Sequence, residues 1–192
     1  MAYKDAFGKG MDEIIAVRDA KRERGKGENA CTYCGVFRKQ ALNKASREMG
    51  TNKLAIGHNA DDIGQTLLIN LLRGEAGNAF DTNEEAPEGC VRRIKPLVYN
   101  LEQECGLYAR LQELPFHQEK CPYAKEAFRR LVKEFLDKAE AERPGVKFSL
   151  LNSALAQNNT GKKGALAPCA ECGEPSNNKV CRACQLKKEL DA

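Results

Sequence analysis

The sequence predicts an α/β protein that carries a small cysteine-rich unit at its C-terminus. In KLAIGHNADDIGQTLLINLLRG, an apolar run at residues 54–57 precedes a polar turn and then an amphipathic segment. Strand, turn and helix in this order form the repeating unit of a parallel α/β sheet. The last 24 residues hold two CxxC pairs. At 192 residues, the chain can form one domain of about 150 residues and a small appendage.

The composition is that of a globular protein, with 42% hydrophobic and 30% charged residues and a mean hydropathy of −0.58. No apolar run approaches the roughly 18–20 residues that cross a bilayer, and MAYKDAFGKGMDEII lacks the apolar core of an export signal. We therefore expect a cytoplasmic protein without a membrane partner. In that compartment the nine cysteines suit metal binding or chemistry better than disulfides. The net charge of +4 permits nucleic-acid binding without indicating it.

The first half of the chain predicts a helix, a strand and a second helix. Residues 36–49 have apolar side chains at helical spacing, and the segment begins directly after a CxxC and ends before Gly50. The strand at residues 54–57 leads into a helix that ends at Gly74. Two aspartates lie in the first turn of this helix, where their negative charge stabilises the positive end of the helix dipole.

The second half predicts a polar loop at residues 75–90, a strand in RRIKPLVY (residues 92–99) and a helix at residues 101–114. Pro122 suits the first position of a long amphipathic helix that ends before Pro144. Its apolar face contains Ala124, Ala127, Phe128, Leu131, Phe135 and Ala139. The predicted domains are residues 1–155, a linker at 156–168 and a cysteine unit at 169–192.

The C-terminal cysteines have the spacing of a zinc site. Two CxxC pairs are separated by eight residues, and they comprise Cys169, Cys172, Cys181 and Cys184. Four thiolates so arranged can surround Zn²⁺ tetrahedrally, and so small a unit has no core of its own without a metal. We expect a structural site, a zinc ribbon, because protein ligands fill all four positions. Two disulfides or four free thiols are the alternatives.

Cys31 and Cys34 form a third CxxC with no second pair nearby. Cys121, in KCPYA, is the other cysteine in a comparable setting, because a Cys-Pro ligand after a CxxC occurs in iron–sulfur proteins. Three thiolates would leave one iron of a four-iron cluster open. The alternative is a redox or persulfide-forming CxxC, with Cys121 packing at a helix end. Cys90 and Cys105 lack ligand spacing and are interpreted as ordinary thiols.

GHNADD, at residues 57–62, is a second candidate site. Polar residues at the carboxyl end of a parallel strand lie where open α/β sheets bind ligands. Asp61 and Asp62 point about 100° apart on a helix, so one can brace the fold while the other faces a substrate or Mg²⁺. Alternatively, both carboxylates simply complement the helix dipole.

Four motifs, CTYCGVFRKQAL, GHNADDIGQTLLINLLRGE, EKCPYA and the C-terminal double CxxC, occur in this order. Together they resemble the cytoplasmic tRNA 2-thiolation (thiouridylase) family of PP-loop ATP pyrophosphatases, from about Tyr3 to the C-terminus. The resemblance implies a partial Rossmann-like parallel sheet of the PP-loop (adenine nucleotide alpha hydrolase-like) type. It also implies ATP-dependent synthesis of 2-thiouridine at the wobble position of tRNA.

The resemblance further implies site residues. Cys31, Cys34 and Cys121 would hold a [4Fe–4S] cluster and serve in catalysis, and an older family interpretation makes them direct carriers of persulfide sulfur. Arg38 and Gly57 would contact ATP/Mg²⁺, and Asp62 would be a catalytic carboxylate. The implied partners are tRNA, a sulfur donor (sulfide or a ubiquitin-like sulfur carrier) and a second copy in a homodimer.

The sequence departs from the family upstream of the matched region. It contains neither the family's N-terminal zinc ribbon nor its Ser-Gly-Gly-x-Asp-Ser phosphate loop, so it resembles the C-terminal two-thirds of the enzyme. A truncated chain, a misplaced start codon or a split gene with a separate PP-loop subunit would each explain this, and we expect poor activity from the chain alone.

Two other functions stay open at this point. One is a non-catalytic metal- and tRNA-binding subunit, which ATP binding would distinguish from the enzyme. The other is a thioredoxin-like oxidoreductase built on Cys31 and Cys34, although this CxxC does not follow a thioredoxin-type strand.

Overall fold

The computed structural model describes residues 7–22, 28–75, 86–117, 119, 121–123, 128–156 and 166–191. The chain forms two compact units. Unit 1 comprises Met1–Leu54, Glu85–Arg92 and Lys163–Ala192, and unit 2 comprises Ala55–Glu84 and Arg93–Lys162. Each unit is described by itself. Within the described part, no helix combines the length and apolar character that spanning a membrane requires.

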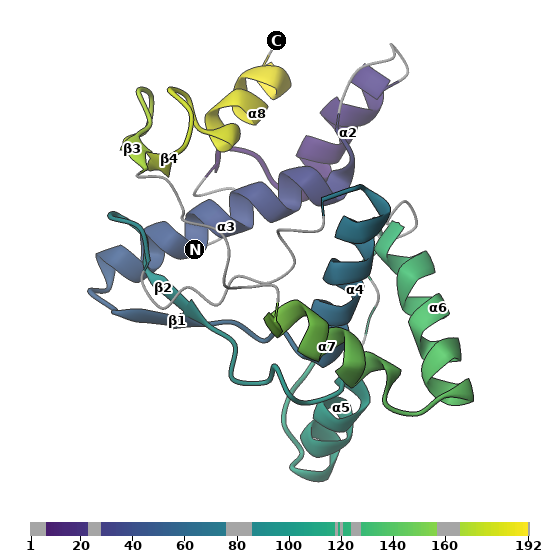
Figure 1. Ribbon diagram of the computed structural model, residues 1–192. Coiled ribbons are helices and arrows are strands. Elements are labelled where there is room, and N and C mark those ends of the chain that lie inside the picture. The colour runs from purple at the N-terminus through teal and green to yellow at the C-terminus, as the bar shows by residue number, and fades with distance from the viewer. Residues whose placement is uncertain are drawn as a thin grey trace. The chain divides into compact units, whose positions relative to one another are not determined.

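Unit 1 is built around α3 (Ala30–Glu48), the long helix in Figure 1. The side chain of Asn29 caps its N-terminus by accepting a hydrogen bond from the Thr32 N–H at 2.9 Å. α2 (Met11–Arg22) and α8 (Arg182–Asp191) pack with α3, and a short antiparallel hairpin, β3 (Ala167–Pro168) and β4 (Pro175–Ser176), precedes α8. One hydrophobic cluster joins all three helices.

The core of unit 1 contains three of the C-terminal cysteines. Tyr33 and Phe37 of α3 are almost fully buried, and they cluster with residues of α8 and with Cys169, Cys181 and Cys184. The C-terminal segment therefore shares its core with α3. The predicted domain bounds stay a prediction, and most of the predicted linker, residues 157–165, lies outside the described residues.

Unit 2 is mainly helical. It contains α4 (Ala60–Leu72), α5 (Glu102–Leu111), α6 (Phe128–Glu142) and α7 (Val146–Ala156). α4 packs on α7 through a cluster that includes Ile63, Leu67 and Leu151, and on α6 through Ile69, Val132 and Leu136. Burial of these side chains is the main stabilising contribution to unit 2.

Two strands, β1 (Lys53–Ala55) and β2 (Arg92–Ile94), pair in parallel. The Ile56 N–H extends the pairing by donating to the Ile94 carbonyl at 2.9 Å. α4 follows β1 directly, so the predicted α/β fold with a parallel sheet and helices is confirmed.

Three local predictions need correction. β2 ends at Ile94, because Pro96 has no N–H to donate and residues 96–99 form a turn. Pro122 lies in a turn at residues 122–123, and the described helix begins at Phe128; residues 124–127 lie outside the described part. α6 buries Val132 and Leu136, whereas three residues of the predicted apolar face are exposed: Phe128, Leu131 and Phe135.

Candidate functional site

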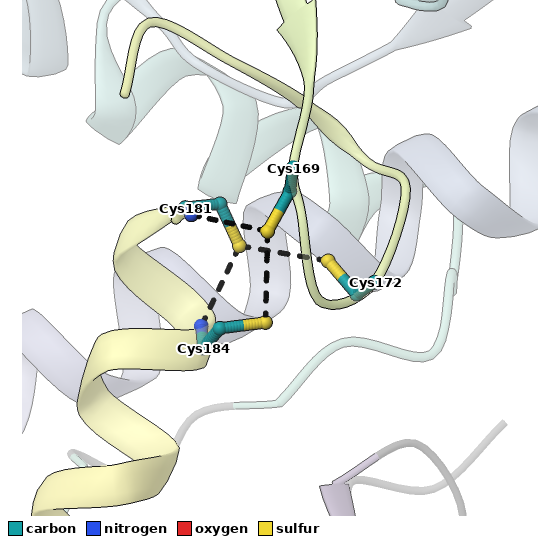
Figure 2. Close-up of side chains that lie close together, drawn as sticks. All are labelled: Cys169, Cys172, Cys181 and Cys184. Atoms are coloured by element: carbon teal, nitrogen blue, oxygen red, sulfur yellow. Dashed lines mark hydrogen bonds between the residues drawn. The ribbon is translucent and has the colours of Figure 1, made fainter. Parts of the chain in front are cut away.

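The four C-terminal cysteines lie together in unit 1 (Figure 2). Cys169 and Cys172 flank the turn between β3 and β4, where the Cys169 N–H donates to the Glu174 carbonyl at 2.9 Å and the Gly173 N–H donates to the Cys169 carbonyl at 2.9 Å. Cys181 and Cys184 lie at the start of α8. A β-turn thus supplies one CxxC and a first helical turn supplies the other.

The geometry of the sulfur atoms fits a tetrahedral metal ion. All four lie within 4.8 Å of one another. The sulfurs of Cys169 and Cys184 are 4.0 Å apart, and those of Cys172 and Cys181 are 3.6 Å apart. A tetrahedron with metal–sulfur bonds of about 2.3 Å has edges of about 3.8 Å. None of the four thiols forms a disulfide.

The electrostatics of the group also favour a cation. Backbone N–H groups of Cys181 and Glu171 donate to the Cys169 sulfur and lower the pKa of this thiol to about 6. Burial and the neighbouring sulfurs raise the pKa of Cys184. A divalent metal ion among these closely packed sulfurs would stabilise their thiolate forms.

The third CxxC lies at the N-terminal end of α3, with Cys31 exposed and Cys34 partly buried. Cys31, Cys34 and Arg38 share one helical face because they are spaced by three and four residues. Arg38 is exposed. Tyr33 and Phe37 fix the opposite side of this turn in the core, so the thiols are held on a rigid helix.

Gly57, Asp62 and Cys121 belong to unit 2. Cys121 is an exposed free thiol. Gly57 is exposed, and a Cβ built on it would meet nothing within 4 Å, so local packing does not require glycine there. Cys90 and Cys105 are also free thiols, and burial raises the pKa of Cys105.

The two adjacent aspartates have different surroundings. Asp61 is buried; its Oδ1 lies 2.5 Å from Lys147 Nζ, and its Oδ2 accepts the Glu102 N–H at 2.7 Å. Asp62 forms a capping box with Asn59, in which each backbone N–H donates to the other side chain, at 3.0 and 3.1 Å. The Asp62 side chain is 36% exposed.

Arg129 of α6 lies beside Asp62 and was not predicted from the sequence. Its guanidinium donates to the Gln65 side chain at 3.2 Å and to the Thr66 hydroxyl at 3.0 Å, and it lies 4.0 Å from Asp62 Oδ1. No local sequence pattern marks this arginine, because the contact joins residues more than sixty positions apart.

No protein-family model matches the sequence. Curated relatives do match it along its length. The chain is 33% identical over 203 residues to cytoplasmic tRNA 2-thiolation protein 1 of Saccharomyces cerevisiae (99% of this chain, 55% of the relative). It is 35% identical over 196 residues to the protein of that name from Drosophila ananassae (100% and 55%). The chain thus spans about half the length of these relatives.

The fold is similar to a solved structure, that of the U34-tRNA thiolase NcsA from Methanococcus maripaludis with its [4Fe–4S] cluster. The two chains are 33% identical with a TM-score of 0.77, covering 97% of this chain and 58% of the thiolase. Sequence and fold therefore agree. The resemblance to the cytoplasmic tRNA 2-thiolation family that the motifs predicted is confirmed over the whole of this chain.

Proposed function

We propose that this chain takes part in the ATP-dependent 2-thiolation of the wobble uridine of tRNA. The observation that carries the proposal is the match of 97% of the chain to a U34-tRNA thiolase, at 33% identity and a TM-score of 0.77. Because the chain spans 58% of that thiolase, we assign it thiol, nucleotide and RNA contacts and not the complete reaction.

The reaction has two steps. The C2 oxygen of uridine is a poor leaving group, so it first attacks the α-phosphate of ATP and releases pyrophosphate. A sulfur nucleophile then adds at C2, and AMP leaves with the original oxygen. Sulfide supplies the sulfur directly; with the thiocarboxylate of a ubiquitin-like carrier protein, water then hydrolyses the acyl–sulfur bond and releases the carrier as its carboxylate.

The residues of this chain suit both steps. Arg38 is always charged and exposed, so it can neutralise phosphate charge. Asp62 presents a partly exposed carboxylate that can orient the nucleotide's Mg²⁺, and the exposed backbone at Gly57 leaves room for the nucleotide to approach. Surface lysines and arginines would bind the tRNA backbone in a salt-dependent manner.

Cys31, Cys34 and Cys121 are the residues that would hold a [4Fe–4S] cluster. Cys31 and Cys121 are exposed and Cys34 is partly buried, and three thiolates are the donor set that such a cluster requires when one iron is left open. When bound, the cluster supplies a protected position for sulfide. The C-terminal group, Cys169, Cys172, Cys181 and Cys184, would hold Zn²⁺ as a structural ion.

Nucleoside mass spectrometry tests the proposal. The chain is combined with the part of the Methanococcus thiolase that it does not cover and is incubated anaerobically with tRNA, ATP and sulfide. We expect 2-thiouridine from the wild type and a large loss in Asp62→Asn and Arg38→Ala. Normal activity in both variants would contradict the assigned roles.

A non-catalytic metal- and tRNA-binding subunit is the second candidate, favoured by the group of four C-terminal cysteines, which can hold a metal ion without any nucleotide chemistry. Equilibrium dialysis with labelled ATP distinguishes the two functions. No ATP binding by the combined protein, together with retained tRNA binding, would favour the subunit.

A further inference from the structure

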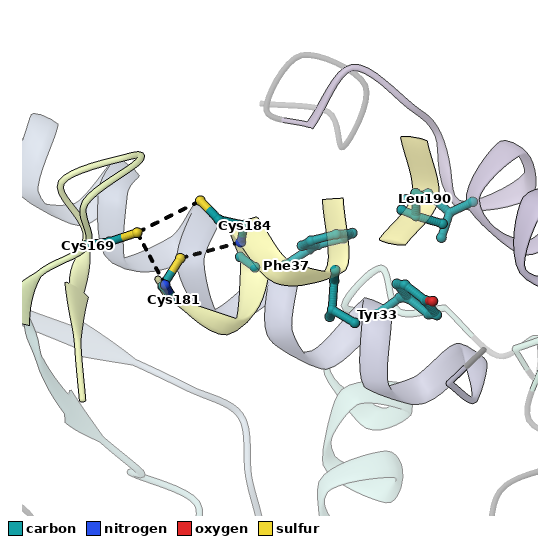
Figure 3. Close-up of a cluster of buried hydrophobic side chains, with 9 residues drawn as sticks. Tyr33, Phe37, Cys169, Cys181, Cys184 and Leu190 are labelled. Carbon is teal, nitrogen blue, oxygen red and sulfur yellow. Dashed lines mark hydrogen bonds between the residues drawn. The ribbon is translucent and has the colours of Figure 1, made fainter. Parts of the chain in front are cut away.

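One stripe of α3 is covered by the C-terminal cysteine segment along most of the helix. Tyr33 and Phe37 belong to the cluster that contains Leu186 and Leu190 of α8 (Figure 3). Three polar residues, Gln40, Asn43 and Arg47, continue the same stripe at helical spacing. All three make side-chain hydrogen bonds to the cysteine segment.

Gln40 contacts the sulfur atoms directly. Its side-chain amide donates to Cys172 Sγ at 3.5 Å and to Cys181 Sγ at 3.8 Å. One acceptor belongs to each CxxC pair, so a single amide from α3 bridges the two halves of the metal site. Hydrogen bonds of this kind orient metal ligands and stabilise thiolates.

Asn43 and Arg47 hold the turn that positions Cys169. The carboxylate of Glu174 accepts a hydrogen bond from Asn43 Nδ2 at 3.4 Å and forms an ion pair with Arg47. The carbonyl of the same glutamate accepts the Cys169 N–H. Asn43 is buried, so its contact with Glu174 is shielded from water.

We propose that Gln40 is a positioning residue for the four-cysteine metal site, and that metal loading of this site in turn holds α3 in place. Three of the cysteines pack in the same core as Tyr33 and Phe37. Loss of the metal would therefore weaken the packing of α3, the helix that carries Cys31 and Cys34. The proposal does not depend on whether those two cysteines bind a cluster.

The first test measures metal release from the Zn²⁺-loaded 192-residue chain to a chromophoric chelator. Gln40→Met keeps the length and helix preference of the side chain but removes the N–H donor. We expect release about tenfold faster, since loss of such an outer contact typically costs 10–100-fold in metal affinity. Cobalt substitution should also show a shifted sulfur-to-metal charge-transfer band.

Lys44→Met is the matched control. Lys44 lies one turn further along α3, is more than half exposed and faces Glu48 at 3.8 Å, so its replacement should leave both zinc release and the cobalt spectrum unchanged. Equal release from Gln40→Met and the wild type, or an equal effect of the control, would overturn the role of Gln40.

The second test measures hydrogen exchange with and without zinc, in protein prepared without iron. We expect faster exchange in residues 30–48 after zinc removal, and an intermediate rate in zinc-loaded Gln40→Met. α4 of unit 2 is the internal control and should not change. Unchanged exchange in α3, or a wild-type chain that takes up no zinc, would overturn the coupling. Because no tRNA, ATP or iron is present, failure here is separate from failure of the proposed function.

Discussion

At the scale of single residues, Asp61 and Asp62 show how neighbouring carboxylates acquire different roles. Asp61 is buried. Its carboxylate forms an ion pair with Lys147 and accepts the Glu102 N–H, so both interactions stabilise the fold. Asp62 caps α4 and remains 36% exposed. Asp62 is thus the more exposed of the two carboxylates, and its catalytic role stays a prediction.

Replacing Lys147 should destabilise the protein strongly. Lys147 Nζ lies 2.5 Å from Asp61 and 2.6 Å from Asp137, and Lys147→Met would leave the buried Asp61 carboxylate without its cation. Breaking such a pair costs about 3–5 kcal/mol of unfolding free energy, measured by urea denaturation. Lys133→Met removes the exposed pair with Glu102 and should cost at most about 1 kcal/mol. An equal loss of unfolding free energy in the Lys147 and Lys133 variants would contradict the structural role of Asp61.

Gly89 should not tolerate a side chain. Its φ is +77°, and an added Cβ would lie 2.6 Å from Cγ of Pro175. Gly89→Ala combines a backbone strain of about 1–2 kcal/mol with overpacking of about 1–3 kcal/mol. Gly50→Ala is the matched control, because its φ is +65° but nothing lies within 4 Å. A Gly89 variant that unfolds at the same urea concentration as the Gly50 variant would refute the close approach.

At the scale of elements, α6 caps α7. The Glu140 carboxylate accepts the Gly145 and Lys147 N–H groups, each at 2.8 Å, and these two hydrogen bonds lower the pKa of Glu140. The stabilisation is therefore present above the unfolded pKa of about 4.3 and is lost as the pH falls through the lower folded pKa.

Replacing Glu140 tests this cap. Glu140→Gln should lower the unfolding free energy by about 1 kcal/mol at neutral pH. The difference from wild type should shrink as the pH falls below about 4, in urea titrations at a series of pH values. A difference that stays constant down to pH 2 would contradict the cap.

Patterns that depend on neighbours along the chain were predicted well. α3 and α4 follow from apolar spacing and the glycines after them, and β1 from its short apolar run. The predicted start of the first helix was wrong, because α3 begins at Ala30 and contains the CxxC, and β1 covers residues 53–55 and not 54–57. The buried side of α6 could not be predicted, because Phe128, Leu131 and Phe135 form an apolar stripe as convincing as the one that α4 covers. Which stripe is buried depends on tertiary packing.

At the scale of the whole molecule, the candidate residues divide between the two units. Cys31, Cys34 and Arg38 belong to unit 1, and Gly57, Asp62 and Cys121 belong to unit 2. The proposed function needs both. Spacing alone predicted the C-terminal group of four cysteines. Local patterns also indicated Cys31, Cys34, Cys121 and the turn at residues 57–62, and the family resemblance added Arg38 and assigned roles. Gln40 and Arg129 carry no such signal, since their partners lie far away in the sequence.

The measurement that tests the central claim most directly is anaerobic purification followed by iron, sulfide and zinc analysis of the wild type and of Cys31→Ala, Cys34→Ala and Cys121→Ala. We predict about four iron and four sulfide per chain, lost in each variant, while zinc is retained because Cys169, Cys172, Cys181 and Cys184 are intact. Zinc without iron in the wild type would contradict the account and return Cys31 and Cys34 to a persulfide-carrying or redox pair.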